Sequence, residues 1–285
     1  MSVRSLLDVP APAKLNLFLH VVGQRNDGYH LLQSAFMLID WADTLHFDLR
    51  ADGRITREDI NSRADLPEND LVVRAACALQ TATGCKLGAH IGLEKRIPME
   101  AGMGGGSSDA ASCLLALNRL WDLKLPLQQL MEIGLNLGAD VPFFLGGRNA
   151  WVEGIGEQLQ ALDLPPGQFL VVKPPSGAST PKIFQSPNLQ RATKRTTIAV
   201  FVANGVDQIF EFGHNDLQPV AQTLCPDIKI GLQWMKNQGL LGRMTGSGSA
   251  LFARVKEAVD TSTLPPGWIA RNCNNLLDHP LIEWR

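Results

Sequence analysis

The sequence predicts an α+β fold built from two domains. Its 285 residues, of which 45% are hydrophobic, provide a sizeable core and fit one large domain or two modest ones. Stretches typical of strands and of helices are mixed without a steady strand–helix–strand rhythm, which favours α+β over a doubly wound sheet. Residues 163–177 contain four prolines and two glycines, a composition typical of a domain boundary. We therefore expect an N-terminal domain at 1–165 and a C-terminal domain at 166–285.

The first expected strand carries two polar residues on one face. From Lys14 to Val21 apolar residues alternate with others, as in a half-buried strand, so Lys14 and Asn16 point the same way. After a polar turn at 24–28, further strands are expected at 34–41, 44–49, 89–94, 169–172, 251–255 and 268–272. Helices are expected at 71–79, with Asn69 as the capping residue, and at 127–137 and 228–237.

Composition and charge exclude several classes of partner. A formal net charge of −2 gives no general attraction to nucleic acids or anionic membranes. No apolar run approaches the roughly 20 residues that span a bilayer. The five cysteines are scattered without zinc-like spacing, and the histidines have no metal-ligand spacing, so no protein-held metal site is predicted. We expect a cytoplasmic protein that binds a small molecule and interacts with neither nucleic acid nor membrane.

A glycine-rich segment is the strongest functional signal in the chain. Glycines allow backbone N–H groups to approach a polyphosphate, and the apolar spacing after residue 109 predicts a helix whose positive dipole end points at the same place. Serine hydroxyls at the end of the segment suit phosphate oxygens or Mg²⁺. The predicted phosphate-binding residues are Pro98, Met99, Glu100, Ala101, Gly102, Met103, Gly104, Gly105, Gly106, Ser107 and Ser108.

The alternative for this segment is a flexible loop with a serine helix cap. Four glycines within five positions argue against it, because each glycine costs conformational entropy and the cluster indicates a required backbone shape. The chain has no GxxxxGK[ST] loop and no GxGxxG motif, which excludes the P-loop and dinucleotide-binding classes.

These residues carry a resemblance to a known family. Residues 98–111 resemble the second motif of the GHMP kinases, the superfamily of galactokinase, homoserine kinase, mevalonate kinase and phosphomevalonate kinase, and residues 245–250 (TGSGSA) resemble its third motif. Residues 12–17 with Gly28-Tyr29-His30, and residues 138–143, resemble the branch that phosphorylates cytidine diphosphate methylerythritol. The likeness runs from about residue 12 to residue 253 and is weak around 185–240. Glu100 and Ala101 depart from it, since some relatives have glycines there.

The resemblance implies a two-domain GHMP kinase fold with the active site in the cleft between the domains. It implies ATP and Mg²⁺ as cofactors, and transfer of phosphate to the 2-hydroxyl of the cytidine substrate in non-mevalonate isoprenoid synthesis. A monomer or weak homodimer is expected. The alternatives are a GHMP kinase for another acceptor, which Gly28-Tyr29-His30 disfavours, and a non-catalytic relative, which retention of both Lys14 and Asp140 disfavours.

The resemblance also assigns catalytic roles. Asp140 would accept the proton of the acceptor hydroxyl, and Lys14 would keep that carboxylate ionised and neutralise charge near the γ-phosphate. Taken alone, Asp140 before Val141-Pro142 is typical of a helix cap, and Lys14 of a solvated strand residue.

Substrate-binding roles follow from the same resemblance. The chain's single tyrosine would stack on the cytosine base, with the neighbouring histidine at its polar edge. Tyr29, His30 and Phe184 also have an ordinary structural explanation, as core aromatics or a turn residue. A separate expectation is that Arg191 lies in a solvated loop. The predicted substrate-binding residues are Asn16, Tyr29, His30, Phe184, Gly246, Ser247 and Gly248.

Overall fold

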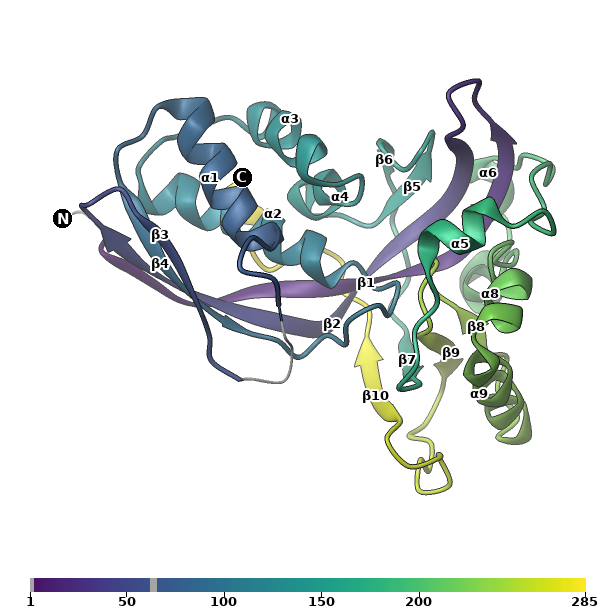
Figure 1. The fold of residues 1–285 in the computed structure, drawn as a ribbon. Helices are drawn as coiled ribbons and strands as arrows, with labels where there is room; N and C mark the ends of the chain where they lie inside the picture. The colour runs from purple at the N-terminus through teal and green to yellow at the C-terminus, as the bar shows by residue number, and fades with distance from the viewer. Residues whose placement is uncertain (1–2, 62–65) are drawn as a thin grey trace.

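The computed structural model describes residues 3–61 and 66–285, and within them the strands form two sheets (Figure 1). The first sheet has the order β3-β4-β2-β5-β6, with β1 paired to β2, and the second has the order β10-β7-β9-β8. The first sheet contains β1 Ser5–Gln24, β2 His30–Arg50, β3 Ile55–Asp59, β4 Gly88–Glu94, β5 Ala150–Glu153 and β6 Gln158–Ala161. The second contains β7 Gln168–Lys173, β8 Arg243–Met244, β9 Leu251–Val255 and β10 Ile269–Asn274.

A layer of helices covers one face of the first sheet (Figure 1). This layer consists of α1 Leu71–Thr83, α2 Gly105–Leu120, α3 Leu127–Leu137 and α4 Val141–Gly146. Helix α2 is buried along most of its length because it lies between the sheet and its neighbouring helices, and its buried polar residues make hydrogen bonds or ion pairs within the protein. Phe47 of β2, Leu114 of α2 and Phe144 of α4 belong to the same core cluster.

The second sheet packs between the first sheet and a second group of helices. Along β7, Phe169 and Val171 join the core shared with the first sheet, while Leu170 and Val172 join the core shared with α8 and α9, as the two-residue period of a strand requires. The second group comprises α5 Thr180–Gln185, α8 Gln218–Leu224 and α9 Pro226–Asn237. Outside it, the chain also forms α6 Ile198–Val202, α7 Gly205–Gln208 and short 3₁₀ turns at Ile209–Glu211 and Ile282–Trp284, and Phe201 of α6 belongs to the core shared with the first sheet.

The prediction of a half-buried first strand is wrong, because residues 11–21 of β1 are all buried. The helix layer covers one face of β1 and the second sheet covers the other, so neither face meets solvent. A register shift between Asn16 and Leu19 also breaks the expected alternation, and Phe18 packs with Leu15 and Leu17 instead of sharing a face with Asn16. The expectation that Lys14 and Asn16 share a face is confirmed, since their side chains hydrogen-bond to each other.

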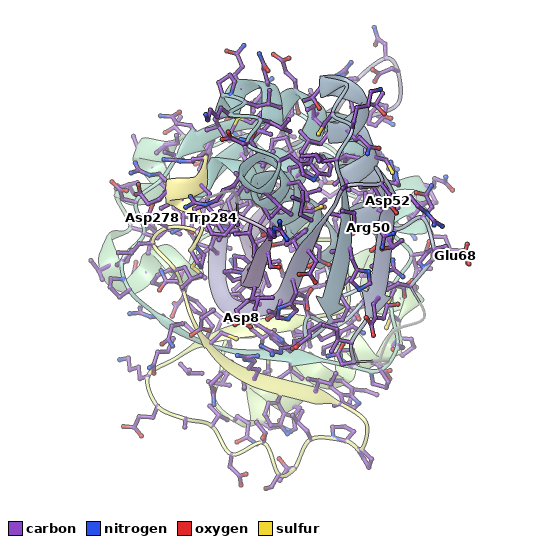
Figure 2. All side chains as sticks on the ribbon, turned by 90° about the vertical axis from the view of Figure 1, so that its left-hand side faces the viewer. Asp8, Arg50, Asp52, Glu68, Asp278 and Trp284 are labelled. Atoms are coloured by element: carbon purple, nitrogen blue, oxygen red, sulfur yellow. The ribbon has the colours of Figure 1, made fainter. Side chains whose placement is uncertain are left out.

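The two strands expected at 34–41 and 44–49 are one strand, β2. Asp43 lies between the two expected strands, and its carboxylate is fully buried and accepts hydrogen bonds from the backbone N–H groups of Arg96, at 2.5 Å, and Ile97, at 2.7 Å. A buried carboxylate is tolerated inside a strand where neighbouring amides satisfy it. At the far end of β2, Arg50 pairs with Asp52 on the surface (Figure 2).

The other expected elements are present, with small shifts at their ends. Helix α1 is capped by Asp70 rather than Asn69, since the Asp70 side chain accepts from the Val73 N–H at 3.0 Å. Helix α3 and strand β9 have the expected bounds, and α9 begins two residues earlier, at Pro226. No helix in residues 3–61 and 66–285 is long and apolar enough to cross a membrane.

The last residues of the chain return to the first sheet. Asn275 forms a bridge with Ile39, and the guanidinium of Arg119 lies 5.1 Å from the ring centre of Trp284, which is labelled in Figure 2. Leu281 belongs to the core of the helix layer. The segment after β10 thus contacts the N-terminal half, and the boundary at 165/166 stays a prediction.

Candidate active site

Three cavities lined by described residues form a row across the molecule. The loop cavity has a volume of about 450 Å³ and is bounded by the glycine-rich segment. The central cavity, of about 300 Å³, is bounded by β1, β2 and the residues just before α4. The outer cavity, of about 610 Å³, is bounded by the β1–β2 turn and α5. The loop and central cavities share Gly102 and Gly104. The central and outer cavities share Phe184, Thr180 and Ile155. The three cavities therefore adjoin one another, with the central cavity between the other two.

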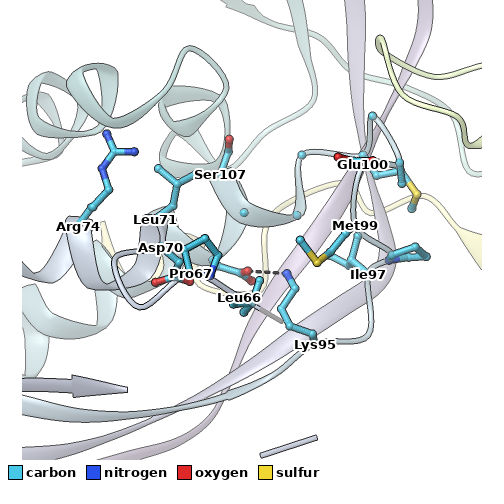
Figure 3. Close-up of a pocket in the computed structure, with 18 of the residues that line it drawn as sticks. Leu66, Pro67, Asp70, Leu71, Arg74, Lys95, Ile97, Met99, Glu100 and Ser107 are labelled. Carbon is cyan, nitrogen blue, oxygen red and sulfur yellow. Dashed lines mark hydrogen bonds and ion pairs between the residues drawn. The ribbon is translucent and has the colours of Figure 1, made fainter. Parts of the chain in front are cut away.

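The glycine-rich segment curves around the loop cavity and leads into α2. Figure 3 shows Arg74 and Leu71 on one wall of this cavity and Met99 and Glu100 on the other. Gly104 precedes α2 in the left-handed conformation, with φ 71°, and no side chain caps the helix. The first N–H groups of this 16-residue helix are thus open to an anionic ligand.

Most of the predicted phosphate-binding residues line this cavity. Ser108 does not, because its buried hydroxyl donates to the Pro12 carbonyl at 2.7 Å and ties α2 to β1. The residues in the cavity wall are Pro98, Met99, Glu100, Ala101, Gly102, Met103, Gly104, Gly105, Gly106 and Ser107. Of the two serines, the geometry leaves Ser107 free to meet a ligand.

The second and third glycine-rich motifs pack backbone against backbone. A Cβ on Gly102 would lie 2.3 Å from the Thr245 carbonyl oxygen, and a Cβ on Gly248 would lie 2.0 Å from the Gly102 nitrogen. The Ala250 N–H also donates to the Ala101 carbonyl at 3.2 Å. Gly248 is therefore fixed against the loop and lines none of the three cavities, whereas Gly246 and Ser247 line the central one. This contact holds the loop against the second half of the chain.

We expect Gly102→Ala to lower the free energy of unfolding by about 2 kcal/mol or more, since φ is +71° and the new methyl group meets backbone atoms that cannot move aside. Gly106→Ala is the matched control, because its Cβ would meet nothing closer than the flexible end of Leu71, at 3.3 Å. Urea unfolding of both variants measures the difference. Equal losses would contradict the proposed backbone contact.

An ion cluster beneath the loop escaped the sequence analysis. The Lys95 ammonium binds the Asp109 carboxylate at 2.6 Å, the dashed line in Figure 3, and also binds Asp43. Burial acts to lower the pKa of Lys95, but the two carboxylates outweigh burial and raise it. Burial raises the pKa of Asp109 against the attraction of Lys95. Because two carboxylates surround one ammonium, the cluster has no net positive charge with which to attract a phosphate group. The sequence signal was a charged residue, Asp43, inside a long apolar strand.

The central cavity brings together the two predicted catalytic residues. The Lys14 ammonium lies 3.6 Å from the Asp140 carboxylate, and the lysine side chain is 4% exposed against 31% for the aspartate. Asp140 precedes α4, but its side chain makes no capping hydrogen bond, so its carboxylate is free to meet a ligand. The backbone N–H of Lys14 donates to the Met103 carbonyl at 2.9 Å, which fixes β1 beside the glycine-rich loop.

Several contacts hold the Lys14 ammonium in place. It donates to the Asn16 side-chain oxygen and lies 4.5 Å from the ring centre of Phe36. Asn16 is held in turn, since its amide donates to the Ser34 hydroxyl at 3.0 Å. Burial lowers the pKa of Lys14, and Asp140 opposes that shift. A positioned cation beside an accessible carboxylate is suited to proton transfer next to a developing negative charge.

The outer cavity is lined by the predicted aromatic residues. Tyr29 is 60% exposed, and the rings of His30 and Phe184 lie 5.0 Å apart. The prediction that Arg191 lies in a solvated loop is wrong: its Nε donates to His30 Nε2 at 3.0 Å, and its other nitrogens donate to backbone carbonyls. Three backbone acceptors around one guanidinium fix this edge of the cavity.

Comparisons with known proteins agree with the fold and the order of motifs. The family model for the GHMP kinases N terminal domain matches residues 70–148, and that for the GHMP kinases C terminal matches residues 206–261. A 4-diphosphocytidyl-2-C-methyl-D-erythritol kinase from Polaromonas naphthalenivorans is 61% identical over 99% of this chain and 97% of its own length.

Solved structures extend the comparison. A crystal structure of 4-(cytidine 5'-diphospho)-2C-methyl-D-erythritol kinase matches with a TM-score of 0.73 at 34% identity, covering 88% of this chain and 90% of its own. A homoserine kinase from Cytophaga hutchinsonii, at 16% identity and a TM-score of 0.70 over 98% of this chain and 96% of its own, shows the fold alone. The predicted α+β GHMP kinase fold is thereby confirmed. The chain belongs to the GHMP kinase family, and relatives at about 60% identity over 99% of its length are named 4-diphosphocytidyl-2-C-methyl-D-erythritol kinases.

Proposed function

We propose that this chain transfers the γ-phosphate of ATP to the 2-hydroxyl of 4-diphosphocytidyl-2-C-methyl-D-erythritol, giving ADP and the 2-phosphate, in the non-mevalonate route to isoprenoid precursors. The relatives that match over the whole chain carry the name of this kinase. The structural observation that carries the proposal is the row of three cavities with Lys14 and Asp140 in the middle one. A nucleotide at one end and a base at the other would direct the two reacting groups to the centre.

The loop cavity is assigned to ATP, as expected for a GHMP kinase. The N–H groups of residues 102–106 and the start of α2 would bind the phosphates, with the Ser107 hydroxyl beside them. Mg²⁺ binds proteins through one or two oxygen ligands together with substrate phosphates. Ser107 supplies such an oxygen in the loop cavity, and the ion would neutralise charge on the transferred phosphoryl group.

Asp140 and Lys14 are assigned the catalytic roles. Because the transition state of phosphoryl transfer is loose, orientation and charge neutralisation contribute more than a strong base. Asp140 would accept the hydroxyl proton, and Lys14 would hold the carboxylate in position and neutralise charge on the phosphoryl oxygens. Asn16, Gly246 and Ser247 would position the acceptor within the central cavity.

The outer cavity is assigned to the cytosine base, which Tyr29 and Phe184 would stack against while His30 meets its polar edge. ATP as co-substrate and five free cysteines favour a cytoplasmic location. We propose a monomer or weak homodimer, with residues 1–165 and 166–285 as the two domains.

A product screen tests the proposed function. The purified protein is incubated with ATP and Mg²⁺ and with one acceptor at a time: the cytidine diphosphate substrate, homoserine or mevalonate. We expect ADP and a phosphorylated product with the cytidine compound alone. Turnover of homoserine or mevalonate instead would assign a different acceptor, and no turnover with any acceptor would support a non-catalytic role.

We expect Tyr29→Ala to raise KM for the cytidine substrate about tenfold or more while KM for ATP stays within about twofold, because stacking of a base on an aromatic ring contributes about 1–3 kcal/mol. The side chain is 60% exposed, so folding should be unaffected. Leu241→Ala, at a 64% exposed position, is the control and should leave both constants unchanged. Steady-state kinetics with each substrate varied give the answer. An equal rise in both KM values would refute the assignment of the cytosine base to the outer cavity.

A further inference from the structure

The hydrogen bond between Arg191 and His30 fixes where the histidine carries its proton. The Arg191 Nε–H donates to His30 Nε2 at 3.0 Å. A guanidinium has donors and no acceptor, so Nε2 must bear a lone pair. The neutral imidazole then carries its proton on Nδ1. Burial and, second, the Arg191 charge lower the pKa of His30, which keeps the ring neutral near pH 7.

Arg191 is itself held rigidly, so this tautomer is enforced rather than sampled. Its remaining nitrogens donate to the carbonyls of Leu189 at 3.1 Å, Phe184 at 2.9 Å and Ser186 at 2.8 Å. Rotation of the guanidinium away from His30 would break these bonds together. The planar fork of an arginine fits this arrangement, whereas a lysine ammonium would satisfy fewer of the acceptors.

The other ring nitrogen is available to a ligand. His30 lines the outer cavity next to Phe184, whose ring lies 5.0 Å away, and His30 Nδ1 has no hydrogen-bond partner among residues 3–61 and 66–285. The ring thus offers one N–H donor and no free acceptor. A ligand that places a second donor against this atom leaves both donors unpaired, which is costly in a partly desolvated site.

We propose that Arg191 is a positioning residue that holds His30 as the Nδ1–H tautomer, and that this donor makes the outer cavity select cytosine over uracil. N3 of cytosine accepts a hydrogen bond, whereas N3 of uracil carries a proton and donates. The inference rests on the proposed function, because it concerns the base of the same substrate. It adds a residue outside every predicted motif and a chemical reason for the choice of base.

The tautomer is tested on the wild-type protein, without any variant that must fold. Nuclear magnetic resonance of protein labelled with ¹³C and ¹⁵N on histidine distinguishes a protonated from an unprotonated ring nitrogen. We expect His30, assigned by the signal that disappears in His30→Asn, to show a protonated Nδ1 and an unprotonated Nε2 at pH 7. A proton on Nε2 would overturn the proposal.

The selection of the base is tested by kinetics with the cytidine substrate and its uridine counterpart. For Arg191→Gln we expect the ratio of the two kcat/KM values to fall about tenfold or more, with KM for ATP within about twofold. Arg195→Gln, at an exposed arginine on the same loop, should keep the wild-type ratio. If Arg191 merely supported the cavity wall, both substrates would weaken equally and the ratio would not change, which would overturn the proposal.

A pair of histidine substitutions provides the conservative rescue. The asparagine amide places an N–H group near the position of Nδ1, whereas a glutamine amide reaches toward Nε2. His30→Asn should therefore keep more of the preference for cytidine than His30→Gln, and the reverse order would count against the proposal. Failure of the proposed function would look different, because wild-type protein would then phosphorylate neither the cytidine nor the uridine compound.

Discussion

Asp140→Asn is expected to reduce kcat by about a thousandfold or more while KM for ATP stays within about twofold. The substitution keeps the shape of the side chain but removes the group that accepts the hydroxyl proton. The loop cavity, which would hold the nucleotide, does not include Asp140. Turnover measured by product formation, and nucleotide affinity measured by calorimetry, separate the two effects.

The same experiment includes a control for folding. The Asp140 side chain is 31% exposed and makes no capping bond, but its carboxylate pairs with the buried Lys14 ammonium, so the variant should remain folded with a lowered unfolding temperature. Asp122→Asn is a matched change at a position 79% exposed, where the left-handed φ of 53° suits asparagine, and it should leave kcat unchanged. An Asp140→Asn variant at the wild-type rate would remove the proposed mechanism.

Lys14→Met is expected to lower kcat about a hundredfold to a thousandfold without unfolding the protein. The thioether side chain fills a similar volume beside Phe36, and it removes a charge that is almost completely buried. Stability at pH 7 should therefore stay equal or rise, while turnover falls. A large loss of stability would mean that the lysine chiefly supports the fold.

The pH dependence of stability checks the state of Lys14. Because burial lowers its pKa below 10.5, the unfolded chain binds the proton more tightly than the folded chain does. Between the lowered pKa and 10.5 the unfolded state therefore holds more protons, and wild-type stability rises with pH through this window. Lys14→Met lacks this contribution. We therefore expect the unfolding free energy of the wild type to rise relative to that of Lys14→Met as pH approaches 10.5. A difference between the two proteins that stays constant with pH would contradict the lowered pKa of Lys14.

Local sequence carried a large part of the fold and of the candidate site. The spacing of apolar residues placed α3 and β9 at their observed bounds, because a helix or strand with a regular pattern encodes its own period. The glycines at 102–106 marked the loop because their backbone shape is a local property. Lys14 and Asn16 were placed on one face by the two-residue period of a strand. The pairing of Lys14 with Asp140 came from the resemblance to a family, since no local pattern joins residues so far apart.

Two of the misjudged residues, Asp43 and Arg191, share one property: their partners lie far away in the sequence. Asp43 fell between two expected strands, whereas the pairing of β2 with β4 brings Arg96, Ile97 and Lys95 to its carboxylate inside one continuous strand. Arg191 resembled a surface residue until α5 and the β1–β2 turn enclosed it.

The sequence by itself placed the longest helices, α1, α2, α3 and α9, and the loop that suits a phosphate, whereas it divided β2 into two strands. Only the tertiary structure decided which hydroxyl stays free, which glycine contacts another backbone and which nitrogen of His30 can meet a ligand. Helical and strand periods are set by neighbouring residues, but a hydrogen bond between residues 30 and 191 exists only after the whole chain has packed.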